Sequence, residues 1–137
     1  MRLGTEEIFY LNALNTVSGA NARDCIIQGN TISFLVRTEE IGKAIGKNAL
    51  NIENLQKQLR KKVEIFEYSA NAEEFVKKAF FNIRFNSIEI KEGEGKKTVF
   101  VSLDAENKSR MLNNSSKIKR IKEIAKRNYN IEEIRIK

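Results

Sequence analysis

The sequence predicts an α+β protein made of two similar modules, each with the order helix–strand–strand–helix–helix–strand. The first observation is an internal repeat, because three segments recur in the same order at nearly one spacing. The matching pairs, at offsets of 66 to 67 residues, are Glu6–Leu14 with Glu73–Phe81, Gly29–Val36 with Gly95–Leu103, and Asn51–Leu55 with Lys117–Ile121. The second observation is that both halves show the same succession of apolar patterns. We therefore expect one domain over residues 1–69 and a second over residues 70–137.

The first module is expected to begin with an amphipathic helix and to continue with two strands that meet at the turn residues Gly29 and Asn30. A pair of helices separated by a short turn comes next. The second helix of this pair carries its apolar residues at helical spacing, at Ile52, Leu55 and Leu59. The expected ranges are 5–17 for the first helix, 24–28 and 31–37 for the strands, and 62–68 for a closing strand.

The second module repeats this plan, and Asn71 is a plausible N-cap for its first helix. Its two strands are expected to join through a charged connection that contains glycine. The second helix of its helical pair has apolar residues at Ile118, Ile121 and Ala125. The expected ranges are 71–82 for the first helix, 87–91 and 98–103 for the strands, 92–97 for their connection and 132–136 for the closing strand.

The chain has the composition of a soluble globular protein, with 41% hydrophobic residues and a mean hydropathy of −0.46. No apolar run approaches the ~18 residues that a membrane-spanning helix needs. Glu6 and Glu7 stand where a signal peptide would have its apolar region. We therefore expect a cytoplasmic protein without a membrane partner.

The distribution of charge favours a polyanionic partner. The formal net charge is +7 at pH 7. Residues 1–69 contain nine Lys or Arg and eight Asp or Glu, whereas residues 70–137 contain sixteen and ten. The excess of positive charge therefore belongs mainly to the second half.

Several classes of site are excluded by the residue types that the chain lacks. It has no His, which excludes His-based acid–base catalysis and His metal ligands. The single cysteine, Cys25, can form neither an internal disulfide nor a thiolate zinc site, and its apolar neighbours favour a buried structural thiol. The run Gly42–Lys47 lacks the glycine spacing of a P-loop, and Asn48 stands where Ser or Thr would bind Mg²⁺. We expect no enzymatic activity, no metal and no cofactor.

The segment Gly46–Ala49 is a short turn with glycine and lysine between two apolar, helix-compatible segments. A loop of this kind can bring backbone N–H groups and a helix N-terminus against a phosphate. Gly46 allows a tight turn and close phosphate approach, while Lys47 supplies charge, with Lys43 one turn earlier. The alternative is an ordinary connection between helices in which Gly46 is only a C-cap. In a basic chain without catalytic residues, the first interpretation indicates nucleic acid.

The element order, together with the run Ile45–Ile52 at the helix pair, resembles the type II KH domain. In the KH family a GXXG loop clamps the backbone of about four nucleotides of a single strand. Two such modules in a chain of this length resemble the NusA-like transcription factors of archaea, and the resemblance covers essentially the whole chain. It implies two tandem type II KH domains, each with a three-stranded mixed sheet covered by helices.

The resemblance also implies a function. It points to a single-stranded RNA-binding protein without enzymatic activity that acts in transcription termination, antitermination or elongation control at RNA polymerase. Separately, we expect the protein to be a monomer. Two alternatives remain open. KH modules of this type also occur in proteins that bind ribosomal RNA in small-subunit assembly, and a KH fold can become a protein-interaction module after losing RNA contact. Copurification with polymerase rather than with ribosomal particles would separate the first alternative from the transcription hypothesis.

On this resemblance, the RNA contacts of the first module are Lys43, Gly46, Lys47, Asn48, Ala49 and Asn51. Asn48 either caps the following helix or donates to sugar or phosphate. Ala49 departs from the motif, which has its second glycine there. If that position has a positive φ, alanine strains the loop by ~1–2 kcal/mol, whereas a helical conformation makes alanine harmless.

The equivalent loop of the second module, found by counting 66 residues along, is Leu112–Ser115, and it contains no glycine. This segment is either a second cradle for phosphate or a structural turn. The cations of the following helix either contact phosphate or form a solvated helix face. The candidate RNA contacts of the second module are Asn113, Asn114, Ser115, Lys117, Lys119 and Arg120.

Overall fold

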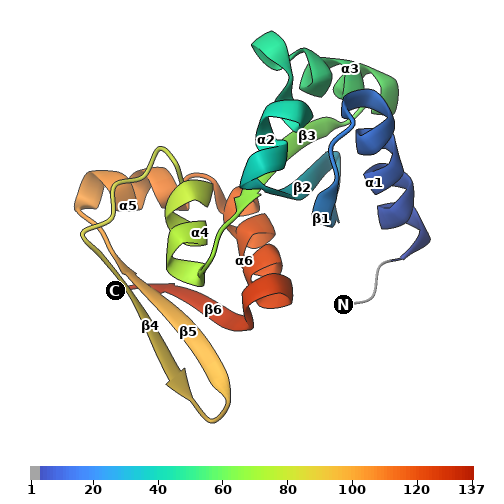
Figure 1. Ribbon diagram of the computed structural model, residues 1–137. Coiled ribbons are helices and arrows are strands. Elements are labelled where there is room, and N and C mark those ends of the chain that lie inside the picture. The colour runs from blue at the N-terminus through green and yellow to red at the C-terminus, as the bar shows by residue number, and fades with distance from the viewer. Residues whose placement is uncertain (1–3) are drawn as a thin grey trace. The chain divides into compact units, whose positions relative to one another are not determined.

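The computed structural model describes residues 4–137, which divide into two compact units with the boundary between Tyr68 and Ser69. Each unit contains helices and one three-stranded mixed sheet, in the order helix–strand–strand–helix–helix–strand (Figure 1). The predicted α+β class and the mixed sheets are therefore confirmed. Within the described residues, no helix combines the length and apolar character needed to cross a bilayer.

The first unit places its sheet strands in the order β1-β2-β3, with β1 and β2 antiparallel and β2 and β3 parallel. The hairpin turns at Gly29 and Asn30, as the sequence predicts. The parallel step from β2 to β3 requires a crossover, which the helix pair provides. The elements are α1 (Thr5–Ser18), β1 (Ala22–Gln28), β2 (Thr31–Arg37), α2 (Thr38–Ile45), a 3₁₀ turn (Lys47–Ala49), α3 (Leu50–Leu59) and β3 (Lys62–Tyr68).

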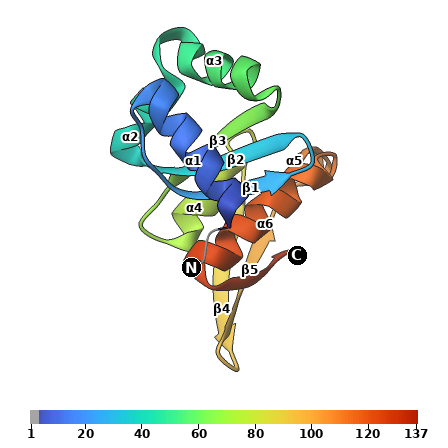
Figure 2. The same ribbon diagram turned by 90° about the vertical axis from the view of Figure 1, so that its right-hand side faces the viewer.

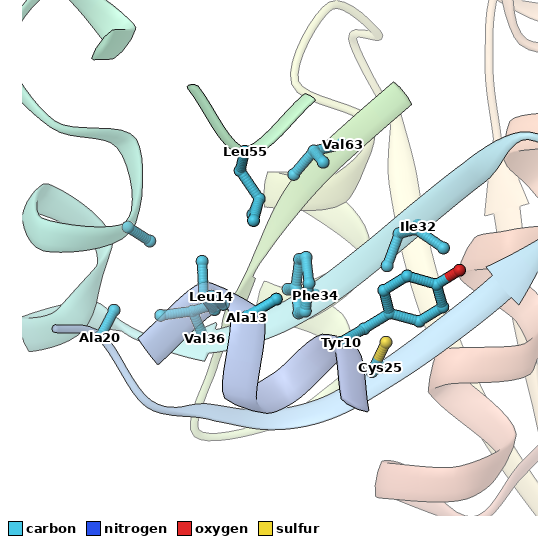
Figure 3. Packing of buried hydrophobic residues seen from close by; sticks show 11 residues of the cluster. Tyr10, Ala13, Leu14, Ala20, Cys25, Ile32, Phe34, Val36, Leu55 and Val63 are labelled. Carbon is cyan, nitrogen blue, oxygen red and sulfur yellow. The ribbon is translucent and has the colours of Figure 1, made fainter. Parts of the chain in front are cut away.

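The hydrophobic core of the first unit lies between α1, α3 and one face of the sheet. In Figure 3, Leu14 from α1 and Leu55 from α3 lie close to Phe34 at the centre of β2. Cys25 is fully buried in this cluster, which confirms the prediction of a structural thiol. Ile52 and Leu59, the other two residues of the predicted apolar face of α3, are partly buried against the same cluster. Ala44 of α2 is also buried in this cluster, so both helices are anchored to the core and hold the two ends of the intervening loop.

The second unit repeats the topology, with strand order β4-β5-β6 and the same antiparallel and parallel pairings. Most of its buried apolar residues come from α4, α6 and the inner face of the sheet, and Phe75, Val99 and Ile121 are fully buried. Figure 2 shows the same elements turned by 90°. They are α4 (Ala72–Ala79), β4 (Ser87–Gly93), β5 (Lys96–Ser102), α5 (Ala105–Leu112), α6 (Ser115–Tyr129) and β6 (Ile131–Ile136).

The connection between the two strands of the second hairpin differs from the sequence prediction. The charged connection expected over 92–97 is mostly strand, and the turn is only Glu94 and Gly95, both with positive φ (55° and 76°). A two-residue turn of this conformation matches the twist of a β-hairpin, so the flanking charged residues can pair as strand. The Asn71 cap is confirmed, since its side chain accepts a hydrogen bond from the Glu74 N–H at 2.9 Å.

The helix that Asn71 begins ends at Ala79 rather than at residue 82. Phe80 leaves the helical region, with φ −96° and ψ 56°, and its carbonyl accepts from the Ile83 N–H at 2.9 Å. Phe80 and Ile83 are buried, so burial of these two side chains offsets the loss of further helical hydrogen bonds. Phe81 lies between them and is exposed.

Candidate nucleic-acid interface

The loop between α2 and α3 has a backbone conformation that requires glycine at its first position. Gly46 is the C-cap of α2, and its N–H donates to the Gly42 carbonyl at 2.9 Å. Its φ of 77° and ψ of 169° lie in a region that only glycine populates readily. A Cβ at this position would lie 2.8 Å from the side-chain Cγ and Nδ2 of Asn51. Gly46 therefore serves both the backbone conformation and the close approach of Asn51.

Asn51 braces the loop from within. Its side-chain Nδ2 donates to the Lys43 carbonyl oxygen at 2.7 Å, which links the last turn of α2 to the first turn of α3. Carbonyls at a helix C-terminus have no partner inside the helix, so this bond also satisfies one of them. On the family resemblance, Asn51 was expected to contact RNA. In the structure, its side chain instead joins α3 to the end of α2, a contact that the sequence pattern did not predict.

Asn48 and Ala49 both adopt the left-handed conformation, with φ of 54° and 60°. Ala49 is the N-cap of α3, so the structure excludes Asn48 as the helix cap. Asparagine tolerates a positive φ, whereas alanine does not. Of the two alternatives for Ala49, the structure selects the strained one. Alanine at the second glycine position of the GXXG pattern therefore keeps the left-handed backbone conformation, but its strain lowers the stability of the folded loop.

Replacing Ala49 by glycine is expected to raise the free energy of unfolding by about 0.5–1 kcal/mol. Relief of the left-handed alanine contributes ~1–2 kcal/mol. Part of that gain, about 0.4–1 kcal/mol, is lost because glycine makes the unfolded chain more flexible. Urea unfolding of wild type and Ala49→Gly measures the difference. Ala44→Gly, in the helical part of α2, is the control and should be destabilising; the same sign for both variants would contradict this assignment.

The side chains at the tip of the loop face solvent. Lys47 and Asn48 are exposed. Lys43 has a 62% exposed side chain, and its Nζ lies 3.5 Å from Glu40 Oε2, so part of its charge is balanced within α2. Ala49 has no side-chain acceptor for the first N–H groups of α3. The loop therefore presents one prominent cation, Lys47, beside the positive end of a helix dipole.

The equivalent connection in the second unit has a different conformation. Leu112 is the last residue of α5, and Asn113 follows with φ −70° and ψ −12°. Asn114 is the N-cap of α6, and its side chain accepts from the Lys117 N–H at 3.4 Å. Positive φ is absent from residues 112–117. The connection is a two-residue turn closed by an asparagine cap, without the shape found at Gly46–Ala49.

The candidate cations of α6 have several neighbours. Lys117 Nζ lies 4.7 Å from the centroid of the Phe81 ring. Lys119 is exposed, and Arg120 is half-buried. Lys122 pairs with Glu133 at 3.3 Å. Each candidate set therefore lies within one unit, the first around the Gly46–Ala49 loop and the second at the start of α6.

A polar cluster at the start of α5 was not predicted from the sequence. The Asp104 side chain caps this helix by accepting from the Asn107 N–H at 2.8 Å, and the buried Asn107 Oδ1 accepts from the Arg84 N–H at 2.9 Å. Hydrogen bonds from the Asn107 backbone and side chain hold the pKa of Asp104 below its usual value. The cap spacing, an Asp three residues before its backbone partner, was the available signal. Its connection to Arg84 depends on the tertiary fold.

Metal-binding clusters of three or more His, Cys, Asp or Glu do not occur among residues 4–137. The two sets of candidate RNA contacts contain amide groups (Asn48, Asn113 and Asn114), ammonium groups (Lys47, Lys117 and Lys119) and the Arg120 guanidinium. Such donors suit the contacts that proteins make to a phosphodiester backbone.

Comparison with known proteins agrees with this geometry. A family model described as "KH domain" matches residues 10–95. Two curated relatives are each named "Probable transcription termination protein NusA": that of Methanocaldococcus jannaschii is 26% identical over 99% of this chain and 75% of its own length, and that of Methanococcus vannielii is 28% identical over 99% and 79%. The crystal structure of APE1850 superposes with a TM-score of 0.86 at 28% identity, covering 98% of this chain and 100% of that one. The chain therefore belongs to the KH domain family and is similar to its NusA-like members.

Proposed function

We propose that this chain binds single-stranded RNA, without enzymatic activity, through two tandem type II KH domains over residues 1–69 and 70–137. The observation that carries the proposal is the conformation of Gly46–Ala49. Gly46, Asn48 and Ala49 have positive φ, Asn51 braces the loop, and Lys47 and Asn48 face solvent. The KH family uses a loop at this place to clamp the backbone of a single strand.

The mechanism follows from what the loop exposes. A phosphate set against the loop meets the Lys47 ammonium and the positive end of the α3 dipole. The absence of a Cβ at Gly46 leaves room for the Asn51 side chain, whose hydrogen bond to the Lys43 carbonyl holds the loop in this conformation. Lys43 and Asn48 add a cation and an amide at the rim. Because these contacts are to phosphate and sugar, they position the strand and carry little sequence information.

The second unit contributes mainly charge in this proposal. Its two-residue turn at Asn113 and Asn114 lacks the backbone shape of the first loop. Lys117, Lys119 and Arg120 follow directly in α6 and add positive charge for contacts to RNA phosphates. The names of the relatives support a role in transcription termination or a related control step at RNA polymerase. We place the protein in the cytoplasm as a monomer.

The test is binding to short single-stranded RNA for wild type and a Lys47→Asp/Asn48→Asp variant. The variant places negative charge where phosphate is proposed to bind, so its affinity should fall at least several-fold, and the wild-type affinity should fall steeply with salt. A matched control is Asn54→Asp/Lys57→Asp, which makes the same charge change at two exposed positions of α3.

The control separates the loop from the overall charge of the unit. It should lose less affinity than the loop variant, and circular dichroism should show that both variants remain folded. Equal losses in the two variants, or unchanged affinity in the loop variant, would contradict the clamp. A wild-type RNA affinity that does not change with salt concentration would contradict contact with phosphate.

A further inference from the structure

Phe81 is the most exposed large apolar side chain in residues 4–137, at 79% of its full accessibility. Its neighbours in the same turn are buried, since Phe80 is 3% exposed and Ile83 is 8% exposed. Exposure of Phe81 is therefore not the result of a loose segment. The chain turns so that two apolar side chains enter the core and the third is held in solvent.

The backbone around Phe81 is anchored at several points. The Ile83 N–H donates to the Phe80 carbonyl at 2.9 Å, and the Arg84 N–H donates to the buried side chain of Asn107 at 2.9 Å. Further along, the Asn86 N–H donates to the Ser102 carbonyl at 2.7 Å. A ring displayed on an anchored segment needs little further ordering when a ligand binds, which favours affinity.

The surroundings of the ring are charged and polar rather than apolar, and the charged group nearest the ring is the Lys117 ammonium. The Lys117 ammonium lies over the ring at 4.7 Å from its centroid. On a second side, Phe81 lines an open hollow of about 470 Å³ together with Arg84, Asp104 and Arg110. A smaller hollow of about 60 Å³, lined in part by Arg110, Asn114 and Lys117, adjoins it. Arg110 also pairs with Glu106 at 2.8 Å, and both Asp104 and Glu106 line the larger hollow beside the two arginines.

An exposed aromatic ring beside cations is the arrangement that proteins use to hold unpaired nucleic-acid strands. The ring offers a stacking surface for any base, and the cations balance the phosphates next to that base. A protein-docking surface would instead surround the ring with further apolar side chains. The residues that line both hollows are predominantly polar, which favours the nucleic acid.

We propose that Phe81 and Lys117 form a second nucleic-acid contact, in which an unpaired base stacks on the Phe81 ring and a neighbouring phosphate pairs with Lys117. This inference rests on the proposed RNA binding and extends it to the unit whose helix–helix turn lacks glycine. It differs from the loop of the first unit because it uses stacking on a side chain, whereas that loop uses backbone shape.

The chain contains no tryptophan, so Phe81→Trp introduces a single fluorescent reporter at the site. Adding single-stranded RNA should quench its emission in a saturable way, and an abasic backbone of the same length should not. The matched control is Phe9→Trp in α1, where the natural side chain is 60% exposed. Its emission should stay unchanged when RNA is added.

Affinity provides an independent measurement. Phe81→Ala should weaken RNA binding by about 5- to 100-fold, the range found when a stacking aromatic is removed, while Phe81→Trp should bind like wild type and Phe9→Ala should change little. If Phe81→Trp binds RNA but its emission does not change, the stacking contact is refuted and the proposed RNA function stands; that result fits a protein-docking surface. If wild type itself fails to bind RNA, the proposed function fails first.

Discussion

Replacing Gly46 by alanine is expected to lower RNA affinity at least about tenfold, which corresponds to ~1.4 kcal/mol of binding free energy. The φ of 77° and ψ of 169° at this position cost a non-glycine residue about 1–3 kcal/mol. The new Cβ would also lie 2.8 Å from the Asn51 side chain and 3.0 Å from its backbone nitrogen. To relieve this clash the Asn51 side chain must move away, which breaks its hydrogen bond to the Lys43 carbonyl and removes the link between α2 and α3.

The measurement is RNA binding by fluorescence anisotropy, together with thermal unfolding. Gly42→Ala is the matched control, because it makes the same chemical change within α2, at a site with open space around the added Cβ. Alanine in a helix is favoured over glycine by roughly 0.5–1 kcal/mol, so this control should be slightly stabilised and should bind normally. Wild-type affinity and melting temperature in Gly46→Ala would show that the loop conformation is not needed.

Replacing Phe34 by alanine is expected to destabilise the first unit by about 3–5 kcal/mol. Phe34 is fully buried at the centre of β2, where α1 and α3 both pack onto the sheet (Figure 3). Folded domains have a total stability of roughly 0.05–0.15 kcal/mol per residue, so the loss is comparable to the stability of a unit of this size. The anchoring of α3 would weaken, and the Gly46–Ala49 loop would lose its support.

Hydrogen exchange can locate this effect within the chain. Amides of the first unit's sheet should lose protection, and RNA binding should fall together with them. Phe9→Ala is the control, since it removes the same side chain from an exposed position of α1 in the same unit. Exposed substitutions usually change stability by less than about 0.5 kcal/mol. Equal effects of the two substitutions would contradict the assignment of Phe34 to the centre of the core.

The features read correctly from the sequence are those set by local chemistry. The apolar spacing of Ile52, Leu55 and Leu59 predicts a helix face, and all three contact the core. Asn71 caps α4 because its side chain and the Glu74 N–H are close in any helix that starts there. The β1–β2 hairpin follows from two apolar runs around Gly29 and Asn30. In each case, the interactions that determine the feature are made between residues that are close together in the sequence.

The errors arise where distant residues compete with local preference. The apolar pattern through Phe81 predicts a helix to residue 82, but burial of Phe80 and Ile83 ends it at Ala79. The charged segment 92–97 was expected to be a connection because its residues are polar. Hydrogen bonding across the β4–β5 hairpin makes most of it strand.

The candidate RNA-binding loop also has features that the sequence determines and features that only the tertiary structure decides. The sequence was sufficient to locate Gly46–Ala49 between two helices and to relate the whole chain to KH proteins, because repeat spacing and residue type are visible without coordinates. It could not tell whether Ala49 is helical or left-handed, since alanine prefers the helix and only packing of α2 against α3 imposes a φ of 60°. The tertiary structure also decided three other features. The Asn51 side chain hydrogen-bonds the Lys43 carbonyl, Phe81 lies beside Lys117, and the turn between α5 and α6 is an ordinary turn closed by an Asn114 cap. These outcomes depend on contacts between helices, turns and strands, which follow from the packing of the whole unit and from no single stretch of residues.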